Sequence, residues 1–169
     1  MSAGIGIFPA SYPVSLMAEE TASLEEQAKA NEGKDSVALF GNEYIRTANK
    51  VGCSHIYKWT EFEEEVIGRK LRLLQSYCNS REDVGAALLY RFMEYIRGAA
   101  DERINLARFV YQLGRLQPGE KAGEEAEIKY SNFCRNMYAW FTDENDRKQL
   151  LTAINIMVYL NRDKENQGG

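Results

Sequence analysis

The spacing of hydrophobic positions changes along this chain and predicts where strands give way to helices. Residues 4–7 alternate glycine with isoleucine, a period of two that predicts a strand over residues 2–8. Glycines on one face of a strand let another part of the chain approach closely. The apolar run at residues 36–40 predicts a second strand.

Between these strands the apolar positions recur at helical spacing and predict a helix over residues 15–31. Ser15 is placed to cap its start, and Gly33 suits the left-handed position that stops a helix. The expected buried stripe consists of Met17, Thr21, Leu24 and Ala28. Residues 2–40 therefore predict a β-α-β unit.

Helical spacing dominates the rest of the chain. Predicted helices cover residues 59–78, 80–96, 101–116, 124–141 and 145–162. Thr60 with Glu63, and Ser80 with Asp83, resemble capping boxes at the first two starts. Short polar joints between such helices are typical of a compact bundle. The aromatic residues at helical spacing, Trp59 and Trp140 included, are expected in its core.

The predicted fold is therefore mainly α, a partial β-α-β unit followed by a five-helix bundle. We divide the chain into the β-α-β part at 1–41, a connector without clear period at 42–57, the helical domain at 58–163 and a frayed tail at 164–169.

Composition narrows the class of protein. The 169 residues carry a net charge of −4, so no strongly basic surface indicates nucleic acid. Three cysteines, an odd number without metal-ligand spacing, favour reduced thiols and a cytoplasmic protein. Cys53 and His55 lack two further ligands, so we expect no zinc or other metal site. No apolar run reaches the roughly 20 residues of a membrane span.

A row of cations is the candidate binding feature of the helical part. Arg108 and Arg115 are seven residues apart and share a helix face, with Tyr111 between them. Such a row can follow a nucleic-acid backbone. In the alternative reading Tyr111 belongs to the core, and the arginines form surface pairs with acidic neighbours. Those neighbours are Glu94, Asp101 and Glu102.

The order of the pieces resembles one family. SAGIGIF and YPVSLMAEETASLEEQAKANEGKDSVALFG are similar to the end of a palm domain of the cyclase and polymerase type. YKWTEFEEEVIGRKLRLLQ, RINLARFVYQLGRL, NMYAWF and DRKQLLTAINIMVYLNR resemble the C-terminal helical domain of the large subunit of type III-A CRISPR effector complexes. An alternative is a diguanylate-type cyclase with an appended helical regulatory domain.

The resemblance implies a parent protein larger than this chain. Such a large subunit carries an HD nuclease domain and a palm whose Gly-Gly-Asp-Asp turn makes cyclic oligoadenylate from ATP with Mg²⁺ or Mn²⁺. Neither the turn nor an HD pair occurs here, so we expect no catalytic residue and no cofactor in this chain. The chain would be a C-terminal piece, prepared as such or initiated internally at Met1.

The resemblance also assigns roles to individual residues. Lys29 matches the palm lysine that projects toward nucleotide phosphates, and Lys34 follows in Gly33-Lys34. Both could instead be ordinary charges at a helix end, and the glutamates of that helix would form a solvated face. In the family, the helical domain resembles the separate small subunit, which stacks beside it along the guide–target duplex. Arg97, Arg108 and Arg115 are then the candidate RNA contacts.

Two strands and one helix are too few for a stable sheet domain. We therefore expect residues 2–40 to be disordered, to pack onto the bundle, or to pair with another chain through exposed strand edges.

Overall fold

A computed structural model gives the fold of the chain. It describes residues 1–9, 11–40, 44–47, 50–53, 55–79, 81, 85–100, 102–119 and 122–167. These residues form two compact units, Met1–Glu65 and Val66–Gly169. The mainly helical fold with a small sheet agrees with the sequence prediction.

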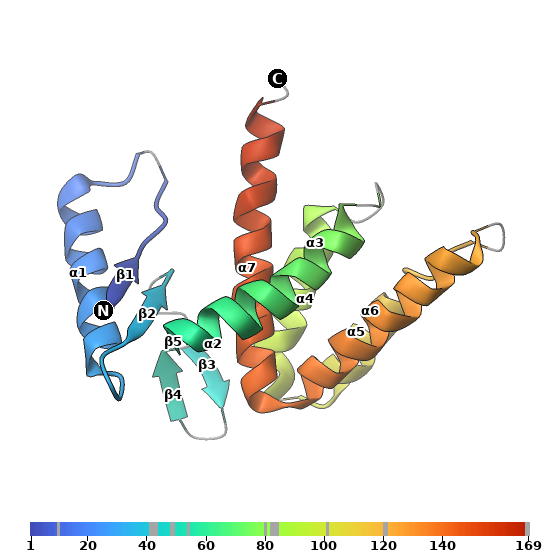
Figure 1. Ribbon diagram of the computed structural model, residues 1–169, viewed down its shortest axis with the longest axis horizontal. Coiled ribbons are helices and arrows are strands. Elements are labelled where there is room, and N and C mark those ends of the chain that lie inside the picture. Colours follow the sequence, from blue (N-terminus) through green and yellow to red (C-terminus); the bar gives the residue numbers. More distant parts are fainter. Residues whose placement is uncertain are drawn as a thin grey trace. The chain divides into compact units, whose positions relative to one another are not determined.

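The first unit contains the predicted β-α-β arrangement (Figure 1). Strand β1, Ala3–Ile5, pairs in parallel with β2, Ser36–Leu39. Helix α1, Val14–Ala30, connects the two strands and packs against both. Of the expected stripe, Leu24 and Ala28 are buried and pack against Ala38 of β2, whereas Met17 and Thr21 are half-buried.

The ends of α1 differ from the prediction. Pro13 occupies the N-cap and its carbonyl accepts the Met17 amide at 3.0 Å, so Ser15 lies inside the first turn and does not cap the helix. The helix ends at Ala30 with Asn31 as C-cap. Gly33 does adopt the left-handed conformation, with φ at 85°, in the turn that leads into β2.

The described residues of segment 42–57, predicted as a connector without clear period, form short strands. Strand β3, Tyr44–Thr47, pairs with β4, Lys50–Cys53, in an antiparallel hairpin. Strand β5, Ile56–Lys58, adds to β2 antiparallel, which gives the sheet order β1-β2-β5. These strands have only three or four residues, too few for a period to be read from the sequence. The third strand covers the second edge of β2, so residues 2–40 are not left with two strands.

One continuous helix starts at Trp59 and changes its winding. It consists of α2, Trp59–Glu61, the π-helix η1, Phe62–Leu71, and α3, Arg72–Cys78. Lys58 is the N-cap, so the predicted capping box of Thr60 and Glu63 does not form. The buried residues of η1 are Val66, Lys70 and Leu71. The apolar spacing of this segment indicates a helix and does not distinguish the π winding.

The remaining helices match the predicted number. They are α4, Ala86–Arg97, followed by the short 3₁₀ turn η2, Gly98–Ala100, then α5, Ile104–Gly114, α6, Glu124–Thr142, and α7, Glu144–Gln167. The predicted capping box of Ser80 and Asp83 lies outside the described residues, as does Asp101. Helix α7 continues through Gln167, so the tail expected to fray from residue 164 is helical.

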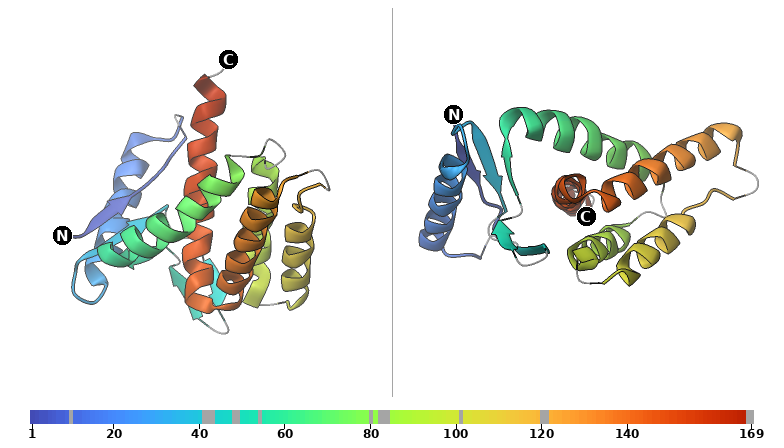
Figure 2. Two further views of the ribbon diagram at one scale, coloured as in Figure 1. Left: turned by 45° about the vertical axis from the view of Figure 1, so that its right-hand side comes forward. Right: turned by 90° about the horizontal axis from the view of Figure 1, so that it is seen from below.

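The second unit packs around α7, which contacts α3, α4 and α6 and is seen end-on in Figure 2. An aromatic series fills the interior. The ring of Phe109 on α5 lies 4.9 Å from Phe92 on α4 and 4.4 Å from Phe141 on α6. Trp140 is buried in the core as predicted. Trp59 is only half-buried, and its indole N–H donates to the Met1 carbonyl at 2.8 Å in the first unit.

Candidate nucleic-acid interface

Helix α5 presents one exposed row along its length. Ile104, Arg108, Tyr111 and Arg115 follow one another at helical spacing, and all four are exposed. The Tyr111 side chain is 65% exposed, which excludes the alternative reading that it belongs to the core. The row therefore presents an aromatic ring between two guanidinium groups, an arrangement that suits phosphates and bases.

The opposite face of α5 fixes the helix in the unit. Phe109 and Leu113 are buried, as the helical period predicts. Asn105 is buried too, and its Nδ2 donates to the Gly98 carbonyl at 2.8 Å, which ties α5 to the turn after α4. A Cβ at residue 98 would lie 2.5 Å from Asn105 Nδ2, so this contact requires the glycine.

Asn105 also orients the first arginine of the row. Arg108 donates from Nη1 to Asn105 Oδ1 at 3.3 Å. The same buried amide side chain thus joins the α4–α5 turn and the exposed guanidinium. Sequence reasoning missed Asn105. The available signal was a polar residue at a stripe position four residues before Phe109.

Arg97 differs from the other two candidate arginines. It lies in the last turn of α4, is half-buried, and interacts with other groups of the chain. A cation there is also stabilised by the C-terminal end of the helix dipole. The α5 row therefore brings together Arg108 and Arg115, while Arg97 belongs to a different helix.

The two candidate phosphate-binding lysines lie in the first unit at the end of α1. Lys29 Nζ is paired with Glu25 Oε1 at 2.8 Å, and the Lys29 side chain remains 53% exposed. Lys34 has a positive φ of 51° in the turn before β2, and its carbonyl accepts a hydrogen bond from the Ser2 hydroxyl. Both side chains are exposed at the same end of the helix.

The glutamates of α1 form a solvated face with local partners, as expected. The Tyr12 hydroxyl donates to the carboxylate of Glu20, and this hydrogen bond raises the pKa of Tyr12. Glu25 is the partner of Lys29. Across the described part of the chain, no three His, Cys, Asp or Glu side chains are grouped as a metal site would require.

A second cationic feature, which sequence reasoning missed, lies at the end of α3. Arg81 donates from Nη1 to the Tyr77 hydroxyl at 2.8 Å and to the Leu116 carbonyl. Its guanidinium lies 5.5 Å from the centre of the Tyr77 ring. Leu116 directly follows Arg115, so Arg81 lies next to the end of the α5 row.

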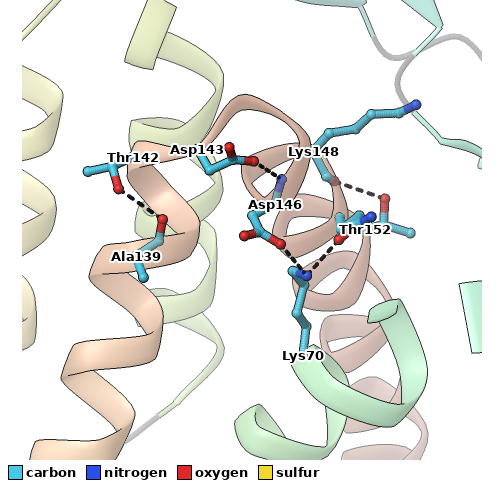
Figure 3. Close-up of polar contacts among 8 residues, drawn as sticks. Lys70, Ala139, Thr142, Asp143, Asp146, Lys148 and Thr152 are labelled. Carbon is cyan, nitrogen blue, oxygen red and sulfur yellow. Dashed lines mark hydrogen bonds and ion pairs between the residues drawn. The ribbon is translucent and has the colours of Figure 1, made fainter. Parts of the chain in front are cut away.

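Lys70 is a buried cation that the sequence pattern also failed to identify. Its side chain is fully buried, and Nζ donates to Asp146 Oδ1 at 2.8 Å and to Gln149 Oε1 at 2.6 Å (Figure 3). Nζ also lies 5.2 Å from the centre of the Trp140 ring. With the charge directed inward and neutralised, Lys70 has a structural role and cannot reach a ligand at the surface.

The described thiols and His55 are buried to different degrees and are not arranged for catalysis. Burial raises the pKa of Cys78 to about 12 and also raises the pKa of Cys134, so both stay protonated near neutral pH. The His55 ring is buried and lies edge-on to Phe40, with the ring centres 5.4 Å apart. The side chain of Cys53 lies outside the described residues.

Among the described residues, no helix combines the length and the apolar character needed to cross a bilayer.

Comparison with known proteins agrees with the resemblance seen in the sequence. Residues 75–163 match the family described as the second helical domain of the Cmr2 subunit of the CRISPR RNA silencing complex. This range contains the whole α5 row and Arg81.

Three curated relatives match nearly the whole chain, and each is named a CRISPR system single-strand-specific deoxyribonuclease Cas10/Csm1 of subtype III-A. The Mycobacterium tuberculosis protein is 36% identical over 167 residues, 99% of this chain and 19% of the relative. The Streptococcus thermophilus protein is 34% identical over 161 residues, 94% of this chain and 19% of the relative. The Enterococcus italicus protein is 31% identical over 164 residues, 97% of this chain and 18% of the relative.

The chain thus spans about a fifth of the length of these relatives. The predicted resemblance to a type III-A CRISPR large subunit is confirmed, and it is favoured over the diguanylate-type cyclase. Because the family model matches more than half of its residues, this chain belongs to the family of the second helical domain of the Cmr2 subunit of CRISPR RNA silencing complexes.

Proposed function

We propose that this chain is the RNA-holding C-terminal module of a type III CRISPR large subunit. It would bind the guide–target RNA and adjoin the small subunit of the complex. The observation that carries the proposal is the exposed row on α5, in which Tyr111 lies between Arg108 and Arg115. The row lies within the residues that match the family model.

The dimensions of the row suit a nucleic-acid strand. Seven residues of α-helix separate Arg108 from Arg115, a rise of about 10 Å along the axis. Phosphates of one stacked strand follow one another about every 3.4 Å along the axis of a duplex. The two guanidinium groups are therefore about three nucleotides apart, and Tyr111 can contact a base or a ribose between them. The net charge of −4 makes this a local attraction.

Removing both charges of the row is expected to weaken RNA binding and its salt dependence. Replacing Arg108 and Arg115 with glutamine should reduce the slope of log K against log salt by about 1.4, because each lost phosphate contact contributes about 0.7 for single strands. Fluorescence anisotropy with a labelled RNA at several salt concentrations measures this slope.

A matched double variant controls for the general loss of positive charge. Arg72 and Arg135 are exposed arginines on α3 and α6, and replacing both with glutamine should leave the slope nearly unchanged. Equal losses in the two double variants would contradict a specific footprint on α5. Far-UV circular dichroism of each variant checks that the helices are intact.

In the parent protein we also propose that Lys29 and Lys34 approach the phosphates of ATP held with Mg²⁺ or Mn²⁺. Exposure of both side chains supports this, and the Lys29–Glu25 ion pair lies on the surface, where exchange for a phosphate costs little. Synthesis of cyclic oligoadenylate and cleavage by an HD nuclease would belong to the missing four-fifths of that protein.

The chain alone is expected to make no oligoadenylate. Phosphoryl transfer of the palm type needs carboxylates that hold two metal ions about 4 Å apart. On α1 the Glu20 carboxylate accepts from Tyr12, and the Glu25 carboxylate is bound by Lys29. Incubation with ATP, Mn²⁺ and target RNA, followed by chromatography of the nucleotides, tests this. Turnover above that of a heat-denatured sample would overturn the non-catalytic interpretation.

A further inference from the structure

A pocket lies beside the C-terminal end of the α5 row. Its volume is about 470 Å³, and its walls come from the end of α3, the chain after α5, and the first turns of α6. The residues that matter for its chemistry are Tyr77, Arg81, Pro118, Glu125, Ala126 and Lys129. The size falls within the range of small-molecule sites, roughly 300 to 1,000 Å³, and is ample for one nucleotide.

The first cation of the pocket is held in place before any ligand arrives. Arg81 is anchored by the Tyr77 hydroxyl and by the Leu116 carbonyl, and it stacks over the Tyr77 ring. Tyr77 is fixed in turn, because its ring is stacked parallel to Phe133 with the ring centres 4.0 Å apart. A guanidinium held this way loses little conformational entropy when it binds an anion.

The second cation is exposed and can change partners. Lys129 Nζ pairs with Glu125 Oε1 at 2.7 Å, and both side chains are largely solvated. A surface pair of this kind contributes little to stability. Among the described lining residues, Arg81 and Lys129 are positive and Glu125 is negative, which gives one net positive charge. Pro118 and Ala126 add an apolar wall that suits a ribose.

The pocket continues the α5 row. Arg115 caps the end of α5, and the carbonyl of the next residue, Leu116, is an acceptor for Arg81. Arg81 is therefore bound to the backbone that directly follows the last arginine of the row. We propose that this pocket binds a phosphate group, and that in the RNA-bound protein it holds the backbone phosphate beyond the one at Arg115. This inference rests on the proposed RNA-binding function.

The test is a binding titration with three phosphate sources. Inorganic phosphate, AMP and a single-stranded RNA of about twelve nucleotides are each added to the full chain, with sodium chloride at matched ionic strength as the blank. Amide signals of Gly123 to Ala126 in a ¹H–¹⁵N spectrum report occupancy. We expect saturable shifts with RNA, and saturation with AMP or phosphate as well would show that a free phosphate suffices.

Two variants in the pocket and one control outside it locate the site. Lys129→Gln should weaken RNA binding about threefold to tenfold and reduce the shifts at Gly123 to Ala126. Arg135→Gln on α6 removes an equal charge outside the pocket and should have little effect on those shifts. Arg81→Lys keeps the charge but loses the planar fork, and should weaken binding at least as much as Lys129→Gln. Unchanged melting temperatures confirm that the variants fold.

Failure of this inference differs from failure of the proposed function. If the Arg108 and Arg115 double variant loses RNA affinity while Lys129→Gln and Arg81→Lys bind normally, RNA follows α5 without entering the pocket, and the inference is wrong. If the signals at Gly123 to Ala126 respond to chloride as strongly as to every phosphate source, it is also wrong. If neither set of variants changes RNA affinity, the proposed footprint itself fails.

Discussion

Replacing Asp146 with alanine is expected to lower the free energy of unfolding of the helical unit by about 2–3 kcal/mol, because it leaves the ammonium of Lys70 without its counter-charge. Lys70 is fully buried, whereas the Asp146 side chain is 29% exposed, so the loss falls somewhat below that of a completely buried pair. Gln149 remains as a neutral acceptor at 2.6 Å. Urea denaturation followed by tryptophan fluorescence and by circular dichroism measures the change.

A double-mutant cycle separates the charge from the packing. Lys70→Met keeps most of the buried volume and removes the charge, so it should cost about 1 kcal/mol, less than Asp146→Ala. Adding Lys70→Met to Asp146→Ala should recover part of the stability, since no unpaired ammonium remains. Strictly additive effects would mean that the two groups are not coupled.

An exposed pair on α6 provides the comparison. Lys129 and Glu125 are separated by 2.7 Å, nearly the same N–O distance as in the buried pair, but both side chains are solvated. Glu125→Ala should leave the unfolding curve unchanged within error. Burial, rather than distance, then accounts for the difference between the two pairs.

The ion pair between Lys70 and Asp146 lies at the connection between α6 and α7. Helix α6 ends at Thr142 and α7 begins at Glu144, so only Asp143 connects them. Asp143 Oδ1 accepts the Asp146 amide at 2.8 Å and caps α7, and the Asp146 carboxylate then reaches Lys70 (Figure 3). The segment from Asp143 to Asp146 thus caps α7 and also binds Lys70 of η1.

The helices were predictable because each must bury an apolar stripe. Phe92 on α4 and Phe109 on α5 lie at stripe positions and are buried as expected. The third strand of the first unit was not predictable, because Ile56–Lys58 is too short to show a period and gains its stability from pairing with β2. The π winding of η1 was not predicted, because the apolar spacing of this segment indicates a helix but not its winding.

The sequence predicted one part of the candidate interface and missed another. The common face of Arg108, Tyr111 and Arg115 follows from helical period and was predicted, and the structure shows that this face is exposed. The side chains that hold cations in position were not predicted. Asn105 and Tyr77 are close in sequence to Arg108 and Arg81, but they are themselves held by Gly98 and Phe133 of other elements, which the spacing of apolar residues does not show.

Replacing Gly4 with alanine is expected to destabilise the first unit by about 2–3 kcal/mol, the cost of forcing atoms into a packed contact. A Cβ at residue 4 would lie 2.5 Å from the Glu25 amide nitrogen, 2.7 Å from the Thr21 carbonyl oxygen and 2.8 Å from Leu24 Cβ. Two of these atoms are backbone of α1, so the helix must move away from β1. This is the close approach that alternating glycines predicted.

Amide hydrogen exchange shows which of the two units is destabilised. The Leu39 amide donates to the His55 carbonyl at 3.0 Å, and the Phe40 amide donates to the Ile5 carbonyl at 2.9 Å, so both report on the sheet. Their exchange should accelerate strongly in Gly4→Ala, while core amides of the helical unit such as that of Phe109 stay protected. Gly114→Ala is the control, because the added Cβ would meet no described atom within 4 Å outside its own stretch of helix, and alanine favours a helix. If amide exchange in the sheet stayed unchanged in Gly4→Ala, the close packing of α1 on β1 at Gly4 would not be needed for stability. The position of Lys29 at the end of α1 would then have to depend on other contacts.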